Sequence, residues 1–170
     1  MDELGRNSVE ENIGSPKRQV VVVLDNVRSG NNVGSILRTA DAMGIAHVHL
    51  CGITAQPPDR QVLKSSLGAE DSVKWSHSEE TSSLIQSLKP EYRIWIVEQT
   101  MDSERLGTVE IPRDKPLALV FGNEVNGVDE SLLSLADKCL EVPQSGYKHS
   151  MNVAVCAGMV LWEICRVSGD

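Results

Sequence analysis

Residues 20–24 read Val-Val-Val-Val-Leu, and this unbroken apolar run is the feature that most restricts the fold. A strand with one face in water alternates apolar and polar residues, whereas a strand buried on both faces does not. Strands of the second kind belong to parallel sheets that helices cover on both sides. We therefore expect residues 19–25 to form a central strand of such a sheet.

Strand and helix patterns alternate along the rest of the chain. Apolar residues recur at helical spacing through residues 33–43, and Gly44 stands where a helix end is expected. Ser76 and Glu79 have the spacing of a capping box before a helix that ends near Pro90. Further strands are expected at 47–51, 93–98, 117–121 and 139–142, and further helices in a short stretch through 67, at 129–135 and at 151–166. This alternation predicts an α/β fold with a mostly parallel sheet flanked by helices.

The length of 170 residues suits one domain, which we place at residues 17–170. Residues 1–16 are polar and contain two glycines and a proline, which predicts a flexible tail. No apolar run reaches a membrane-spanning length, and the first residues lack the layout of a signal peptide. Four cysteines without a Cys-x-x-Cys or Cys/His cluster predict reduced thiols and no metal site. We expect a soluble, cytoplasmic protein with no membrane contact.

The formal net charge of −8 argues at first against a nucleic-acid partner, because phosphate binding normally relies on a basic face. The charge is uneven, however. Residues 17–64 carry six cations and three anions, so this stretch is net positive while the remaining residues are acidic. A local cationic site on an acidic protein is therefore compatible with the sequence, and scattered solvated charge is the simpler alternative.

Three polar segments that follow strand patterns predict sharp backbone bends. They are residues 26–41, 119–127 and 142–152. Open α/β sheets bind ligands outside the carboxyl ends of their strands, which is where these segments are expected. Neither the Gly-x-Gly-x-x-Gly turn of dinucleotide-binding folds nor the Lys-Ser/Thr of a P-loop is present. The expected ligand is thus of another kind.

The three segments resemble the SpoU/TrmH-like branch of the SPOUT RNA methyltransferases. The matching motifs are Asn-Val-Gly-Ser-Ile-Leu-Arg at 32–38, Val-Phe-Gly-Asn-Glu-Val-Asn-Gly at 120–127 and Val-Pro-Gln-Ser-Gly-Tyr-Lys-His-Ser-Met-Asn at 142–152, and the likeness extends over about residues 19–166. The resemblance implies a SPOUT-type fold with a C-terminal trefoil knot and a homodimer. It also implies transfer of a methyl group from S-adenosyl-L-methionine to a ribose 2′-hydroxyl of tRNA or rRNA.

By resemblance, the methyl donor contacts Gly122, Val142 and Met151, with residues 98–100 as further candidates. Glycine after a buried strand allows backbone groups to approach a ligand without an intervening Cβ. Each of these residues could equally serve an ordinary turn or the core.

Arg38 is the residue expected to act in catalysis. A cation beside the ribose oxygen lowers the pKa of that hydroxyl and stabilises the alkoxide that attacks the methyl group. A guanidinium is a poor base near neutral pH, so we expect electrostatic activation and positioning. Without the motif, an exposed arginine on a helix would be read as a surface charge.

Four further residues are placed in the catalytic site by the resemblance: Asn32, Glu124, Ser150 and Asn152. Asn32 could orient Arg38 or contact the substrate, and it could equally cap a helix that starts at Val33. Glu124 could order its loop or pair with Arg38, and it could also be a solvated turn carboxylate. Ser150 and Asn152 stand at the expected start of the last helix, where capping and ligand binding are both compatible.

Arg28 and Lys148 are the expected contacts to RNA phosphates. Two other functions fit the same residues. A non-catalytic RNA-binding or assembly dimer could retain this fold, and a protein that binds a small nucleotide could use the same bends.

Overall fold

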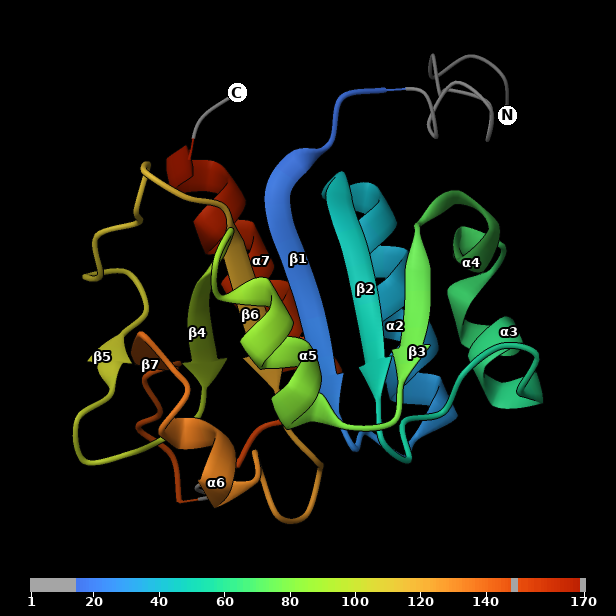
Figure 1. Cartoon of the computed structure of the whole chain (residues 1–170). Coiled ribbons are helices and arrows are strands. Elements are labelled where there is room, and N and C mark those ends of the chain that lie inside the picture. The colour runs from blue at the N-terminus through green and yellow to red at the C-terminus, as the bar shows by residue number, and fades with distance from the viewer. Residues whose placement is uncertain (1–14, 148–149, 169–170) are drawn as a thin grey trace.

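The computed structural model describes residues 15–147 and 150–168, which form a seven-stranded sheet in the order β3-β2-β1-β6-β4-β7-β5. Every strand pair is parallel, so the carboxyl ends of the strands share one edge (Figure 1). The strands are β1 (Arg18–Asp25), β2 (Ile45–Cys51), β3 (Trp75–Ser78), β4 (Arg93–Val97), β5 (Glu104–Arg105), β6 (Leu117–Phe121) and β7 (Lys138–Glu141).

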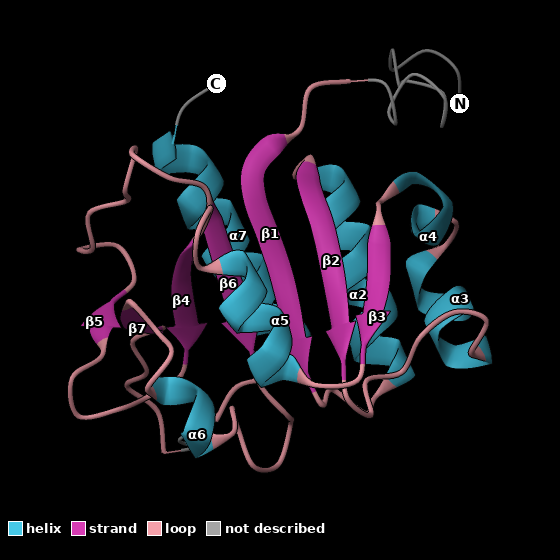
Figure 2. Ribbon diagram, in the orientation of Figure 1, coloured by secondary structure: helices cyan, strands magenta, loops and turns pink. Residues whose placement is uncertain are grey.

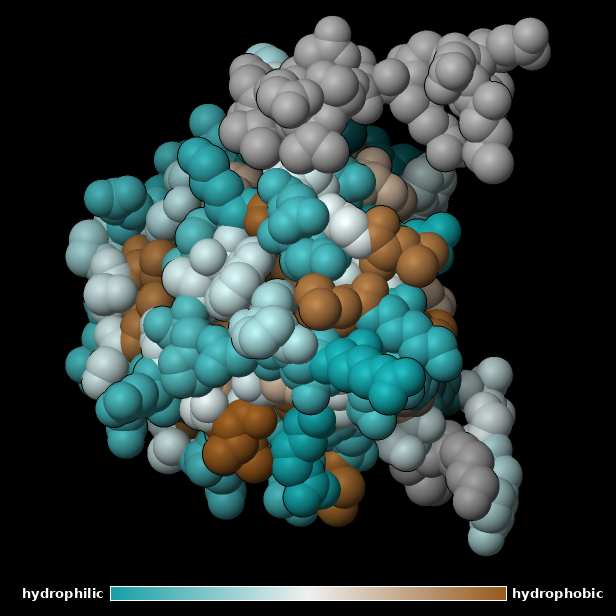
Figure 3. Space-filling model, turned by 90° about the vertical axis from the view of Figure 1, so that its right-hand side faces the viewer, coloured by the Kyte–Doolittle hydropathy of each residue, from teal (hydrophilic) through white to brown (hydrophobic). Residues whose placement is uncertain are grey.

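Helices cover both faces of the sheet (Figure 2). Helices α2 and α7 lie on one face, α3 and α4 pack beside α2, and α5 and α6 lie on the other face. The helices are α2 (Gly30–Ala42), α3 (Arg60–Ser66), α4 (Ala69–Ser72), α5 (Thr81–Leu88), α6 (Glu130–Leu133) and α7 (Val153–Ser168). Seen from the side of β3, α3 and α4, the surface is mostly polar, with hydrophobic residues in separate groups (Figure 3).

The valine run of β1 lies at the centre of this arrangement. Val22 and Leu24 belong to the core beneath α2 and α7, whereas Val21 and Val23 belong to the core beneath α5 and α6. Residues 21–24 are between 0 and 2% exposed, as expected for a strand that is buried on both faces. The prediction of a central strand in a parallel α/β sheet is confirmed.

The order of the strands also indicates where a ligand would bind. β1 pairs with β2 on one side and with β6 on the other, so the chain reverses its direction across the sheet at β1. Such a switch point leaves a crevice beyond the carboxyl ends of the strands, where α/β proteins bind ligands. The loops after β1, β4, β6 and β7 converge at this edge.

One local prediction was wrong. Ser76 was expected to cap a helix, but it lies in β3, opposite His49 of β2. Helix α5 begins at Thr81 after Glu80, whose side chain makes no capping hydrogen bond. The capping pattern at Ser76 and Glu79 therefore has the right spacing but lies several residues before the true start of the helix. Ser76 instead pairs with β2. The short elements β3, α4 and β5 were not predicted at all.

Two histidines on β2 meet this serine. The Oγ atom of Ser76 lies 2.9 Å from Nε2 of His47 and 3.1 Å from Nδ1 of His49, and the two rings stack 4.2 Å apart. Burial, together with the smaller effect of the neighbouring His47, lowers the pKa of His49 to about 4. Both rings therefore fill structural positions in the sheet, as their strand pattern predicted.

Candidate active site at the carboxyl edge of the sheet

A cavity of about 280 Å³ opens at the carboxyl edge, between the loops after β4, β6 and β7 and the start of α7. Its apolar wall comes from strand ends and from the first turn of α7. The residues of this wall are Val97, Phe121, Leu140, Val142 and Val153. The cavity, called the donor cavity below, contains all three residues predicted to contact a methyl donor: Gly122, Val142 and Met151.

A glycine bend forms one side of the donor cavity. The amide of Asn123 donates to the Gly127 carbonyl at 2.8 Å, and the amide of Gly127 donates back at 2.9 Å. Gly127 has a φ of 71°, and a Cβ on Gly122 would lie 2.2 Å from the Val128 nitrogen. A side chain at Gly122 would therefore force the bend open.

Glu98, at the end of β4, holds the far end of this bend. Its Oε2 accepts a hydrogen bond from the Val128 amide at 3.0 Å, and its Oε1 accepts one from the Gln99 amide at 3.0 Å. Glu98 and Gln99 both line the donor cavity, whereas Thr100, the third candidate at this strand end, is not among its lining residues. Burial, together with the charge of Glu98, raises the pKa of the Cys156 thiol to about 11, so this lining residue stays protonated at neutral pH.

Glu124 connects the bend to the loop after β1. Its carboxylate accepts hydrogen bonds from the amides of Arg28 (3.2 Å) and Ser29 (3.0 Å) and from Nδ2 of Asn32 (3.0 Å). Burial raises the pKa of the Glu124 carboxyl, but the backbone hydrogen bonds and the one from Asn32 outweigh this effect and leave the pKa below its ordinary value. Glu124 is therefore an ionised anchor for its neighbours and more than a solvated turn residue.

Asn32 extends the hydrogen-bond network from Glu124 to the third sequence motif. Its Oδ1 accepts a hydrogen bond from Nδ2 of Asn152 at 3.1 Å. Oδ1 of Asn152 in turn accepts from the amides of Ala154 and Val155, which caps α7. Glu124, Asn32 and Asn152 thus form one chain of hydrogen bonds through all three sequence motifs.

Two capping predictions need correction here. Helix α2 begins at Gly30, and its cap is Ser29, whose Oγ accepts from the Asn32 amide. Asn32 therefore lies inside the first turn with its side chain free for the network. Ser150 precedes α7 by three residues and lines the donor cavity, while Asn152 provides the cap.

Arg38 lies outside the donor cavity of its own chain. It is exposed on α2, and its side chain makes no hydrogen bond or ion pair within residues 15–147 and 150–168. Six residues separate it from Asn32, which is about 9 Å along the helix. Of the alternatives for Glu124, a pairing with Arg38 is absent from the described contacts.

The predicted RNA contacts have different outcomes. The Arg28 side chain is exposed beside the Glu124 network, and its backbone amide is the group that Glu124 binds. Lys148 lies outside the described residues. Tyr147, its neighbour, is 91% exposed.

The charge around the donor cavity favours a cationic ligand. Three carboxylates line it, those of Glu98, Glu124 and Glu141, and no lysine or arginine does so among the residues that the structure describes. A negative potential in a partly enclosed cavity attracts a positive group and repels a phosphate. The site is thus better suited to a sulfonium or ammonium ligand than to a nucleotide phosphate.

The described segments give no sign of a metal or membrane site. Within them, no three His, Cys, Asp or Glu side chains are grouped to hold a metal ion. No helix in these segments is both long and apolar enough to cross a bilayer. All four cysteines are free, in agreement with the predicted thiols.

Comparison with known proteins identifies the family. The model of the SpoU rRNA Methylase family matches residues 19–162. The chain belongs to this family. The SpoU match contains all three motifs and every element of the donor cavity, so the resemblance inferred from the motifs is confirmed.

Individual relatives agree with the SpoU assignment. A tRNA (guanosine(18)-2′-O)-methyltransferase of Thermus thermophilus is 30% identical over 166 residues, which cover 96% of this chain and 83% of the relative. The 23S rRNA (guanosine-2′-O-)-methyltransferase RlmB of Haemophilus influenzae is 30% identical over 96% of this chain and 66% of the relative. The AdoMet-bound rRNA methyltransferase structure from Sinorhizobium meliloti superposes with a TM-score of 0.83 at 26% identity, covering 94% of this chain and 61% of that one.

Some residues that organise this site were not predicted. Nδ2 of Asn123 donates to the Asn26 carbonyl at 2.7 Å and so ties the glycine bend to the end of β1. Asn26 has a φ of 56°, a left-handed conformation that asparagine tolerates better than most residues. An asparagine directly after a buried strand was the available signal for this turn. For the start of α2, the available signal was Ser29, because serine is a preferred N-cap residue.

Proposed function

We propose that this chain catalyses the S-adenosyl-L-methionine-dependent methylation of a ribose 2′-hydroxyl in tRNA or rRNA. One observation carries the proposal. In a SpoU-family chain, the network of Glu124, Asn32 and Asn152 joins the three motifs at the mouth of a carboxylate-lined cavity. The relatives' names support both tRNA and rRNA as substrate classes.

The residues of the donor cavity fit this methyl donor. S-adenosyl-L-methionine supplies, when bound, a methyl group activated by a positively charged sulfur. Gly122 presents a backbone edge that a Cβ would block, and Val142 and Met151 present apolar surface. The surrounding carboxylates complement the positive charge.

Arg38 acts on the ribose oxygen as a fixed positive charge. The guanidinium keeps its protons at neutral pH, so it stabilises the developing alkoxide and leaves proton removal to another acceptor. Replacing one such charge typically lowers kcat by about 10²–10³-fold.

A homodimer brings Arg38 to a donor cavity. Helix α7 exposes Val155, Met159 and Trp162 by 55, 44 and 59%, and their spacing puts them on one stripe of the helix. This apolar stripe is suited to pack against a second copy of the chain. In such a dimer, Arg38 of the partner subunit faces the donor cavity of the first, and the Arg28 and Lys148 side chains line the approach of RNA phosphates. We place this reaction in the cytoplasm.

Incubation with labelled donor and separate pools of total tRNA and rRNA tests the activity, and mapping of 2′-O-methyl positions then identifies the nucleotide. Arg38→Ala should lose turnover and retain donor affinity in calorimetry, with Arg60→Ala on α3, which is also exposed, as control. Unchanged turnover in Arg38→Ala would favour a scaffold that binds RNA without catalysis.

Mixing tests the shared site. At a donor concentration too low to fill the Gly122→Ala cavity, Arg38→Ala and Gly122→Ala should each be inactive. Dimers exchanged between them should regain about a quarter of the activity, because half are heterodimers with one intact site. No recovery after proven exchange would place both functions within one protomer.

A further inference from the structure

A second cavity lies at the opposite edge of the sheet, beside the amino ends of β1 and β6. Its volume is about 780 Å³, and its walls are the starts of these two strands, the segment 109–113 and the end of α7. This volume falls within the range of roughly 300–1,000 Å³ that is typical of ligand sites. Neither the donor site nor the dimer stripe uses it.

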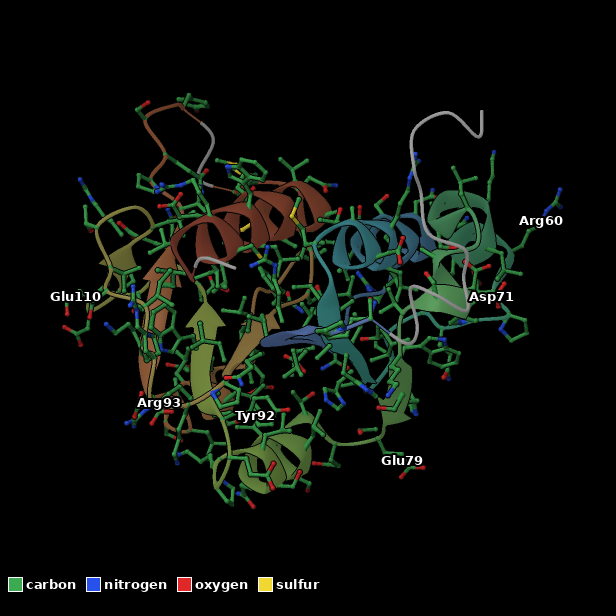
Figure 4. All side chains as sticks on the ribbon, turned by 90° about the horizontal axis from the view of Figure 1, so that it is seen from above. Arg60, Asp71, Glu79, Tyr92, Arg93 and Glu110 are labelled. Atoms are coloured by element: carbon green, nitrogen blue, oxygen red, sulfur yellow. The ribbon has the colours of Figure 1, made fainter. Side chains whose placement is uncertain are left out.

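The second cavity is positively charged. Four of its lining residues are cations, Lys17, Arg18, Arg113 and Lys115, and Glu110 is the one anion among the described residues that line it. Figure 4, which looks down on this edge, shows the Glu110 side chain projecting outward from the molecule. The donor cavity has the opposite character, since carboxylates line it.

At least two of these cations have donors available. Lys115 Nζ donates one hydrogen bond, to the Pro90 carbonyl at 2.9 Å, and an ammonium has three N–H groups. Arg113 is exposed and makes no hydrogen bond or ion pair with any residue in the described ranges. Arg18 has a structural role as well, because it donates to the Met43 carbonyl at 3.0 Å and so fixes the wall of the cavity.

The two cavities lie at opposite ends of one helix on the same face of the sheet. Val153, at the start of α7, lines the donor cavity, and Val167, near its end, lines the second cavity. The fourteen helical steps from Val153 to Val167 correspond to about 21 Å of helix. Val20 and Leu117 of the second cavity and Phe121 of the donor cavity belong to one core. A folded RNA is large enough to reach both.

We propose that the second cavity binds phosphates of the substrate RNA at a distance from the nucleotide that is methylated. The proposal rests on the proposed function, because that function makes RNA the ligand. Binding of a polyanion depends on neutralising its phosphates, and the carboxylate-lined donor cavity contributes nothing to this. The cations at the amino edge add to the attraction that Arg28 and Lys148 provide at the approach to the donor cavity.

The test removes the two available cations together. Arg113→Gln/Lys115→Gln is compared with Arg60→Gln/Lys64→Gln, which removes the same charge from α3, whose residues line neither cavity. Affinity for bulk tRNA and for rRNA fragments is measured over a series of salt concentrations. Loss of two phosphate contacts should reduce the slope of log Kobs against log salt by about 1.4–1.8, and the control pair should leave the slope unchanged.

Kinetics separate this proposal from the proposed function. The Arg113/Lys115 variant should raise KM for RNA and keep kcat and donor affinity, because the chemistry lies a helix length away. If a folded variant has an unchanged salt slope and an unchanged KM for RNA, the proposal that the second cavity binds RNA is wrong. The proposed methyltransferase activity is not affected by that result. Binding of inorganic phosphate or a mononucleotide that the variant loses, with RNA affinity intact, would instead assign the cavity to a small anion.

A wild-type protein that binds RNA through these cations but transfers no methyl group would defeat the proposed function alone.

Discussion

Gly34, inside α2, lies where this helix packs closely against α3. A Cβ added there would lie 2.4 Å from the Val62 carbonyl oxygen and 2.8 Å from the Ser66 nitrogen, both backbone atoms of α3 or its turn. The Ser65 hydroxyl, 2.1 Å away, can rotate aside, but the backbone atoms cannot. Gly34→Ala therefore forces α2 and α3 apart.

Two opposing terms set the size of the effect. Alanine in place of glycine inside a helix gains about 1 kcal/mol from propensity. Overpacking a well-filled contact costs about 1–3 kcal/mol, and a collision with backbone belongs at the upper end. We expect a net loss of about 2 kcal/mol, which corresponds to a fall in Tm of about 4–8 °C for a chain of this size.

Gly158 in α7 is the matched control. Apart from the backbone of its own helix, no atom of the described residues lies within 4 Å of a Cβ added at this glycine, so Gly158→Ala should gain about 0.5–1 kcal/mol. Thermal and urea unfolding measure both the loss of stability expected for Gly34→Ala and the gain expected for Gly158→Ala. A Gly34→Ala protein as stable as the parent would refute the packing argument, and a destabilised Gly158→Ala protein would reveal a contact from a second copy of the chain.

Two more predictions concern the donor cavity and the sheet. Gly122→Ala should weaken donor binding by more than about tenfold in calorimetry, since its Cβ meets the Gly127 and Val128 backbone. Gly146→Ala in the neighbouring loop should bind normally, because no atom of the described residues lies within 4 Å of an added Cβ there. The pKa of His49 is about 4 in the fold against 6.5 unfolded, so the unfolded chain binds more protons between these values. Stability should fall as the pH drops through that window, by at most about 1.4 kcal/mol per pH unit, and equal slopes in urea unfolding of His49→Gln and the parent would contradict this.

The fold was predictable where a local pattern repeats over enough residues. The valine run of β1 and the helical spacing in α2 and α7 each predicted an element of the right type, because burial on a sheet or a helix face imposes a period on the sequence. β5 has only two residues, Glu104–Arg105, and exists because it pairs with β7. A period cannot be read from so short a segment.

Helix ends were less predictable than helices. Ser29 and Asn32 are both good N-cap residues three positions apart, and the sequence favours neither. The structure selects Ser29 because Glu124, from a distant loop, holds the Ser29 amide and the Asn32 side chain together. The same contact frees Asn32 for the site.

The sequence by itself determined the parallel α/β fold, the family and the three segments that meet at the carboxyl edge. Only the tertiary structure decided which side chains touch: Glu124 and Asn32 are 92 residues apart, and Asn32 and Asn152 are 120 apart. It also revealed the cationic cavity, whose lining comes from separate parts of the chain. Periodicity reports the burial of a residue within its own element, whereas hydrogen bonds between loops depend on how the whole sheet brings those loops together.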